Sequence, residues 1–168
     1  MDLSFGPEYD DFRGEVVTFL ANNADKAPKG GDLRGHQAKD WQKLLIENGY
    51  TCRTIPKEFG GYGAEPDIIK TRIIAEEFSK ARVNTGLGGQ GISMLVPTLL
   101  EMGTQEQKEH FIRPTIMGDM IWCQGYSEPG AGSDLAALST AAVLDGDEWV
   151  INGQKIWTST AHIAAWIF

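Results

Sequence analysis

Apolar residues recur every three or four positions through the first part of the chain, as expected for helices with one buried face. Five such stripes can be followed in order. They comprise Phe12, Val16, Phe19 and Leu20; Trp41, Leu44, Leu45 and Asn48; Ile74, Phe78 and Ala81; Ile92, Leu95, Val96 and Leu99; and Phe111, Ile112 and Ile116. Together the stripes predict a helical bundle over about residues 8 to 117.

Glycine and proline separate these stripes. Residues 22–35 and 55–66 are rich in both, so they predict loops and not long helices. Gly49 is placed to end the second helix. Pro97 is compatible with the fourth helix only near its start or at a kink, because proline lacks the backbone N–H.

Two local pairs of polar residues add detail to the helices. Thr104 and Gln107 have the spacing of a capping box, which predicts that a fifth helix begins here and ends at Gly118. Glu76 and Lys80 are four residues apart on the third helix, and this spacing predicts an ion pair between them.

The pattern changes after Gly118, where short segments rich in β-forming residues alternate with turn sequences. The predicted strands are residues 120–127, 140–144, 148–151, 155–157 and 163–168. Residues 145–147 predict a hairpin, and residues 152–153 predict a second turn. We therefore expect an α+β fold, with an N-terminal all-α helical bundle at 1–119 and the start of an antiparallel β-barrel-like domain at 120–168. The last strand has no polar terminator, which predicts that the chain is cut from a longer polypeptide.

The charge balance excludes several classes of function. Lys and Arg number 15 against 23 Asp and Glu, a net charge of −8, and no basic stripe for nucleic acid is present. No apolar run approaches the ~20 residues that span a bilayer, and the acidic N-terminus is unlike a signal peptide. Cys52 and Cys123 form no C-x-x-C motif, so we expect a reduced, cytoplasmic protein.

Candidate metal and phosphate sites are weak. His36, His110 and His162 are too far apart in sequence to suggest a local metal site. The glycine-rich segment 86–91 follows no predicted strand, so it is either a weak phosphate-binding pattern or a flexible connection between helices. Residues 121–168 contain five acids and a single base, Lys155.

Two loops carry the most informative chemistry. In residues 124–134, Gly130 and Gly132 allow close backbone approach, and exposed N–H and hydroxyl groups there could bind an anion or a polar ring edge. The same residue types are also those of an ordinary turn. In residues 152–159, Trp157 stands beside two hydroxyl residues and could pack against a planar heterocycle, or belong to a core.

Three segments in this order resemble the acyl-CoA dehydrogenase family: GTQEQK at 103–108, YSEPGAGSD at 126–134 and INGQKIWTS at 151–159. The resemblance covers the whole chain, from the family's N-terminal helical domain into its middle β domain. It implies an FAD-dependent oxidoreductase that dehydrogenates acyl-CoA thioesters between the α- and β-carbons. It also implies electron transfer to an electron-transfer flavoprotein or a similar acceptor.

The family motifs imply roles for eight residues. The resemblance places Gln124, Tyr126 and Ser127 along the flavin, Gly132 and Ser133 at the FAD phosphate and the acyl-CoA entrance, and Trp157, Thr158 and Ser159 around the isoalloxazine. Of these, Ser133 is expected to contact substrate as well. Family members more often have threonine at the position of Ser127, and the hydroxyl is kept here. We expect Ser127 and Trp157 to lie on one exposed face.

The family's general base is a glutamate of a C-terminal helical domain that this chain does not contain, so no catalytic residue is assigned. Glu128 is interpreted as a structural loop residue. We expect residues 1–168 alone neither to hold FAD tightly nor to dehydrogenate acyl-CoA, since a positioned base contributes about 10²- to 10⁴-fold in rate.

Two alternatives remain: a non-catalytic partner subunit of an acyl-CoA dehydrogenase complex, and acyl-CoA oxidase chemistry with oxygen as acceptor. The wording of the motifs is similar to a bacterial subgroup, some of whose members act on bulky or sterol-derived acyl-CoAs. A homo- or hetero-oligomer, dimer or tetramer, is expected.

Overall fold

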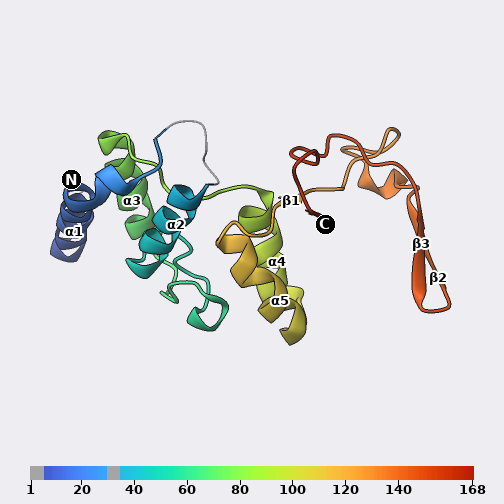
Figure 1. Ribbon diagram of the computed structural model, residues 1–168, viewed down its shortest axis with the longest axis horizontal. Coiled ribbons are helices and arrows are strands. Elements are labelled where there is room, and N and C mark those ends of the chain that lie inside the picture. The colour runs from blue at the N-terminus through green and yellow to red at the C-terminus, as the bar shows by residue number, and fades with distance from the viewer. Residues whose placement is uncertain (1–5, 30–34) are drawn as a thin grey trace.

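A computed structural model of the chain describes residues 6–29 and 35–168, and it begins with five α-helices (Figure 1). Part of the predicted loop 22–35 lies outside the described residues. The helices are α1 (Pro7–Asn23), α2 (His36–Glu47), α3 (Ile68–Ala81), α4 (Val96–Met102) and α5 (Gln105–Ile116). A π-helical turn, Gly91–Leu95, leads directly into α4, and Pro97 lies in the first turn of α4 as predicted. Residues 55–66 contain only the short 3₁₀ turn Lys57–Phe59.

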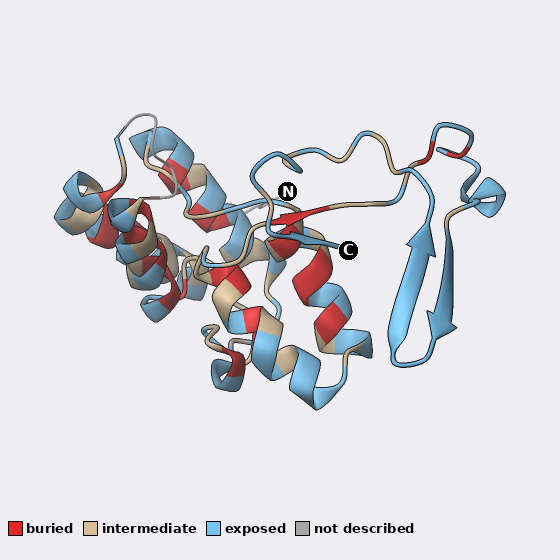
Figure 2. Cartoon of the chain, turned by 45° about the vertical axis from the view of Figure 1, so that its right-hand side comes forward, coloured by how far each residue is buried: buried red, intermediate tan, exposed pale blue. Residues whose placement is uncertain are grey.

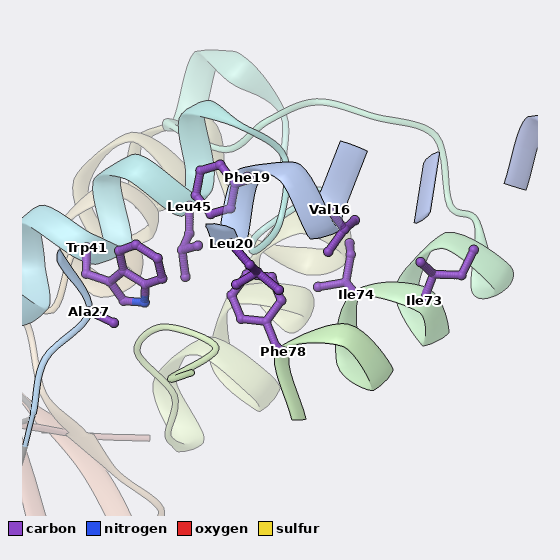
Figure 3. Packing of buried hydrophobic residues seen from close by; sticks show 9 residues of the cluster. All are labelled: Val16, Phe19, Leu20, Ala27, Trp41, Leu45, Ile73, Ile74 and Phe78. Carbon is purple, nitrogen blue, oxygen red and sulfur yellow. The ribbon is translucent and has the colours of Figure 1, made fainter. Parts of the chain in front are cut away.

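The first hydrophobic core joins α1, α2 and α3 (Figure 3). Val16, Trp41, Leu45 and Phe78 are almost fully buried in it, and they come from the predicted stripes. Burying side chains of this size contributes about 1.5 to 3 kcal/mol each, so this core is the main reason that the three helices stay together. Asn48 is exposed and caps α2 instead of joining its buried face.

The predicted ion pair between Glu76 and Lys80 is wrong. Glu76 pairs with Arg72 at 2.8 Å and with Arg13 of α1 at 3.0 Å, whereas Lys80 pairs with Glu77 at 2.7 Å. Arg13 contacts Glu77 as well, so both glutamates bind a cation from another helix. Glu76, which local spacing predicts as the partner of Lys80, is paired with Arg13 of another helix and with Arg72.

The second core is built around α4 and α5. Val96, Ile112 and Ile116 are completely buried there, and Trp122 joins them from the first strand. The capping box is confirmed, since the Thr104 hydroxyl accepts from Gln107 N and the Gln107 side chain accepts from Thr104 N. This box fixes the beginning of α5 and therefore the face that α5 presents to the core.

The strands follow the helices, as the pattern change predicted. They are β1 (Trp122–Cys123), β2 (Ala141–Asp145), β3 (Glu148–Asn152) and β4 (Trp166–Ile167). The antiparallel hairpin of β2 and β3 is confirmed, with Gly146 in the left-handed conformation (φ 63°) that its two-residue turn requires.

Three details of the strand prediction are wrong. β1 and β4 pair in parallel, not antiparallel, with Trp122 opposite Trp166. Residues 155–157 form no strand, because a single backbone hydrogen bond, from Ile156 N to Ser127 O, holds this segment to a neighbour. The predicted strands at 120–127 and 163–168 shorten to two residues each. In the described part of the chain the sheets have two strands apiece, so the fold class is confirmed without a closed barrel.

The segment after β1 is organised differently from the helical part. From residue 124 to 168, all of which the structure describes, only Glu128 and Ala131 are buried. Every residue of the hairpin is exposed, including Trp149, and Figure 2 shows the hairpin as a pale ribbon that projects from the rest of the chain.

Candidate functional site

A cavity of about 200 Å³ lies where the helical part meets the strands. Its walls come from three segments: residues 87–92, which lead from the connection after α3 into the π-helical turn, residues 120–122 at β1, and Ser159 with Thr160. Thr115 and Gly118 complete the lining from the end of α5. The lining is mainly apolar, which suits a small organic group better than an ion.

The glycine-rich segment 86–91 proves to be a connection between helices that also forms this wall. The Gln42 side chain holds it in place by accepting from Leu87 N at 2.8 Å and donating to Ile116 O at 2.8 Å. Gly86 has φ +100°, and a Cβ there would meet the Gln42 Oε1 atom at 2.5 Å. The glycines are apparent in the sequence, but the cavity that this segment lines is not. Their close packing against Gln42 is a long-range contact that no local pattern shows.

Gln90 connects this wall to the first candidate loop. Its side-chain oxygen accepts from Gln124 N at 3.1 Å, and its side-chain nitrogen donates to Gln124 Oε1 at 3.2 Å. Gln124 is the first of the sequence-predicted cofactor residues, so the loop 124–134 begins beside the cavity wall. Gln90 is a site residue that the sequence analysis missed.

The loop 124–134 is a tight turn with open space around its glycines. Glu128 and Ala131 exchange two backbone hydrogen bonds, at 2.7 and 3.1 Å, and these close the turn. A Cβ on Gly130 or Gly132 would meet no atom within 4 Å. Both glycines therefore leave room for a ligand to approach the backbone.

Glu128 is buried, 4% exposed, and its carboxylate accepts four hydrogen bonds. The donors are Lys155 Nζ (2.8 Å), Thr140 N (3.0 Å), and the N and Oγ atoms of Ser139 (2.7 and 2.9 Å). Hydrogen bonds from Lys155 first, and then from Thr140 and Ser139, hold the pKa of Glu128 far below its usual range. A carboxylate with such a low pKa and no free lone pair is a poor general base, in agreement with its interpretation as a structural residue.

The second loop, residues 152–159, carries the most exposed aromatic ring of this region. Trp157 is 84% exposed and has a positive φ of 57°. Ser159 N donates to Trp157 O at 2.9 Å, which tightens the turn that brings Ser159 to the cavity. A largely exposed tryptophan with its backbone in the left-handed region is an uncommon arrangement, and such strain clusters at functional sites.

The structure brings some of the eight predicted residues together. Ile156 N donates to Ser127 O at 2.9 Å, so the backbones that carry Ser127 and Trp157 lie side by side. Lys155 Nζ contacts Tyr126 O at 3.2 Å, which adds a second link between the two loops. Within the described residues, no hydrogen bond joins Gly132 or Ser133 to the other six, and Thr158 is only half-buried.

The described residues show neither a metal-binding cluster nor a membrane-spanning helix. No group of three or more His, Cys, Asp or Glu side chains is placed to hold a metal ion there. No helix in residues 6–29 and 35–168 combines the length and the apolarity needed to cross a membrane.

Known proteins match the chain along most of its length. Family models described as "Acyl-CoA dehydrogenase, N-terminal domain" and "Acyl-CoA dehydrogenase, middle domain" match residues 6–119 and 123–168. The chain belongs to the acyl-CoA dehydrogenase family. This agrees with the resemblance carried by its three motifs.

Two relatives and two solved structures illustrate the likeness. Acyl-CoA dehydrogenase IpdE1 from Mycobacterium tuberculosis is 41% identical over 96% of this chain and 44% of its own length. Short-chain specific acyl-CoA dehydrogenase from human mitochondria is 39% identical over 70% of this chain and 28% of its own length. The ChsE4–ChsE5 complex from Mycobacterium tuberculosis matches with a TM-score of 0.68, at 32% identity, over 100% of this chain and 42% of the matched chain. The Tcur3481–Tcur3483 steroid ACAD gives 0.67, at 32% identity, over 99% and 44%. The chain thus spans less than half the length of these acyl-CoA dehydrogenases.

Acyl-CoA dehydrogenases are generally FAD-dependent, and the donor set of the two loops is compatible with that group. Exposed hydroxyls stand on Ser133 and Ser159, Trp157 offers a free aromatic face, and the space beside Gly132 is open. Lys155 is paired with Glu128, so the pyrophosphate would be met by backbone N–H and hydroxyl groups and not by a cation of this segment.

Proposed function

We propose that the native protein carrying this chain catalyses FAD-dependent α,β-dehydrogenation of acyl-CoA thioesters. The observation that carries the proposal is the meeting of two loops, 124–134 and 152–159, beside the cavity that Ser159 lines. An exposed indole, several hydroxyls and two open glycines are the residue types needed for a planar ring with a polar edge and a phosphate chain.

The proposed roles follow from the chemistry of each side chain. Gln124, Tyr126 and Ser127 would line the flavin, with the Ser127 hydroxyl toward the pyrimidine edge. Trp157, Thr158 and Ser159 would flank the isoalloxazine, and Gly132 and Ser133 would hold the phosphate, with Ser133 also contacting acyl-CoA. Donors fixed in advance at the pyrimidine edge stabilise the negative charge that develops there.

Bound FAD supplies the acceptor for the hydride that leaves the β-carbon of the acyl group. This chain would bind and orient the ring through its hydroxyls and exclude water through the Trp157 indole and the apolar cavity wall. Removal of the α-proton is not assigned to any residue of this chain, because Glu128 is saturated by its four donors.

We also propose that the functional division falls between 1–119 and 120–168. The last helix, α5, ends at Ile116, and the candidate cofactor residues all lie after it. Residues 1–168 alone are proposed to bind FAD weakly and to turn over no acyl-CoA, because the segment that carries the loops has almost no buried apolar residue.

A second candidate function is that of a subunit in a complex of two different acyl-CoA dehydrogenase chains. The ChsE4–ChsE5 complex and the Tcur3481–Tcur3483 steroid ACAD both pair two named chains, which favours this candidate. A bulky, steroid-derived acyl-CoA is the corresponding substrate. The proposed electron acceptor is an electron-transfer flavoprotein or a similar protein.

The test is to purify the native protein without added flavin and to measure FAD released on denaturation. Anaerobic reduction of a dye is then followed with short straight-chain and steroid-derived acyl-CoAs. Stoichiometric FAD with dye reduction is expected, whereas peroxide formation in air would indicate oxidase chemistry. A protein without flavin that gains activity only with a second chain would favour the partner-subunit function, and a protein that neither binds flavin nor supports turnover would contradict the proposal.

A further inference from the structure

The buried carboxylate of Glu128 and the half-buried Lys155 form an ion pair at the point where three segments of the candidate site meet. The Glu128 carboxylate receives donors from residues 139–140 and from Lys155, which are 11, 12 and 27 positions away in sequence. The Glu128 side chain is 3% exposed and that of Lys155 is 23% exposed. With Ala131, Glu128 is the only buried residue between 124 and 168, a range that the structure describes in full. Within this range, the Glu128 carboxylate is the polar group most completely enclosed by the chain.

Lys155, in loop 152–159, connects this loop to loop 124–134. Its ammonium contacts both the Glu128 carboxylate and the Tyr126 carbonyl, at 2.8 and 3.2 Å. The next residue, Ile156, donates its backbone N–H to Ser127 O at 2.9 Å, and Trp157 follows directly. Two consecutive residues of one loop, Lys155 and Ile156, therefore contact residues 126–128 of the other.

Saturation of the carboxylate makes this arrangement specific. A carboxylate has about four lone-pair sites, and all four are used by Glu128. Each carboxylate oxygen accepts from two donors. A glutamine at this position would replace one oxygen by an NH₂ group, which cannot accept a hydrogen bond from its two donors. Such a change removes the counter-ion of Lys155 and takes the acceptor away from the two donors that share the replaced oxygen.

We propose that Glu128 and Lys155 are positioning residues, whose ion pair sets the distance between the Ser127 hydroxyl and the Trp157 indole. The inference rests on the proposed function, since it concerns the two loops that would hold FAD. Neither residue touches the flavin or the substrate in this proposal. Their effect on the reaction passes through Tyr126, Ser127 and Trp157.

The test compares E128Q and K155M with two matched controls in the native protein. K155R keeps the cation, and E148Q makes the same change as E128Q on an exposed residue of β3. FAD affinity and the visible absorption spectrum of the bound flavin are measured. E128Q and K155M should each weaken FAD binding by about tenfold or more, because buried donors or acceptors lose their partner. Both should also change the flavin spectrum at saturating FAD, whereas K155R and E148Q should stay within about twofold of wild type.

The double variant and amide hydrogen exchange separate a positioning role from a direct contact with FAD. The Kd of E128Q/K155M for FAD should exceed that of the weaker-binding single variant by no more than about twofold, because the two residues act as one unit. In E128Q, the amides of residues 126–134 and 154–159 should exchange faster together, while those of α1, α2 and α3 keep their wild-type rates.

The outcomes that overturn the inference are distinct from failure of the proposed function. Wild-type FAD affinity in a folded E128Q protein, with unchanged exchange in both loops, would overturn it. If the wild-type protein bound no FAD, the proposed function would fail. Faster amide exchange in both loops of E128Q would then still show that the ion pair holds the loops together, and unchanged exchange would overturn the inference. If E128Q did not fold, the contrast between K155M and K155R would decide.

Discussion

At the scale of the residue, one buried amide connects most of the features around the cavity. Gln42 is completely buried on α2 and bonds to the end of α5 and to the glycine-rich connection. No periodicity predicted this, because a glutamine within an apolar stripe is indistinguishable in sequence from one at its polar edge. Only its partners, 45 and 74 positions away, give it a role.

We expect Gln42→Leu to lower the free energy of unfolding by about 2 to 4 kcal/mol, since it leaves the part-buried Leu87 N–H and the buried Ile116 carbonyl unpaired. Urea denaturation followed by circular dichroism measures this change. Gln105→Leu, on the exposed face of α5, is the matched control and should stay within about 0.5 kcal/mol. Equal stability of the two variants would show that the Gln42 hydrogen bonds contribute nothing.

Glu77 should make stability depend on pH. Hydrogen bonds from Lys80 first, and from Arg13, lower the pKa of this buried carboxyl below its ordinary value of 4.5. The unfolded chain therefore takes up a proton before the folded chain does, so this contribution is complete above pH 4.5 and is lost as the pH falls through the lower folded value.

The E77Q variant should lose about 1 to 2 kcal/mol at pH 7 and should show a shallower fall in stability below pH 5. Denaturation at a series of pH values tests this, with the exposed E109Q as control. A wild-type slope in E77Q would mean that other carboxylates cause the acid sensitivity.

At the scale of the element, local signals predicted what local contacts decide. The apolar stripes of α1 to α5, the capping box and the β2–β3 hairpin depend on neighbours in sequence, and they are confirmed. The parallel pairing of β1 with β4 joins residues more than forty positions apart, so hydrophobic alternation could not reveal its direction. Residues 155–157 look like a strand, but Lys155 is held by Glu128 and only Ile156 makes a ladder-like bond.

The capping box at Thr104 allows a direct test of one such local signal. Thr104→Ala should lower the free energy of unfolding by about 1 kcal/mol, because Gln107 N loses its acceptor at the start of α5. Thr104→Ser keeps the hydroxyl and should recover most of the loss in the same denaturation experiment. If serine proved as destabilising as alanine, the methyl group of Thr104 and not its hydroxyl would be responsible.

At the scale of the whole molecule, the chain combines a helical part that has two apolar cores with a β segment in which few residues are buried. Sequence motifs identified the family and named the two loops, because their glycines, hydroxyls and tryptophan form a recognisable order. They could not show that Gln90 touches Gln124 or that Ser159 lines a cavity between the two parts. The eight residue roles therefore stay predictions, and the contact between Ser127 O and Ile156 N is the geometry that supports them.

A crystal structure of the native protein with FAD bound would test the proposed cofactor site directly. We expect the isoalloxazine to lie against Trp157 and the hydroxyls of Ser127 and Ser159, with the pyrophosphate beside Gly132 and Ser133 and no contact to Lys155. A flavin bound elsewhere, touching neither loop 124–134 nor loop 152–159, would contradict it.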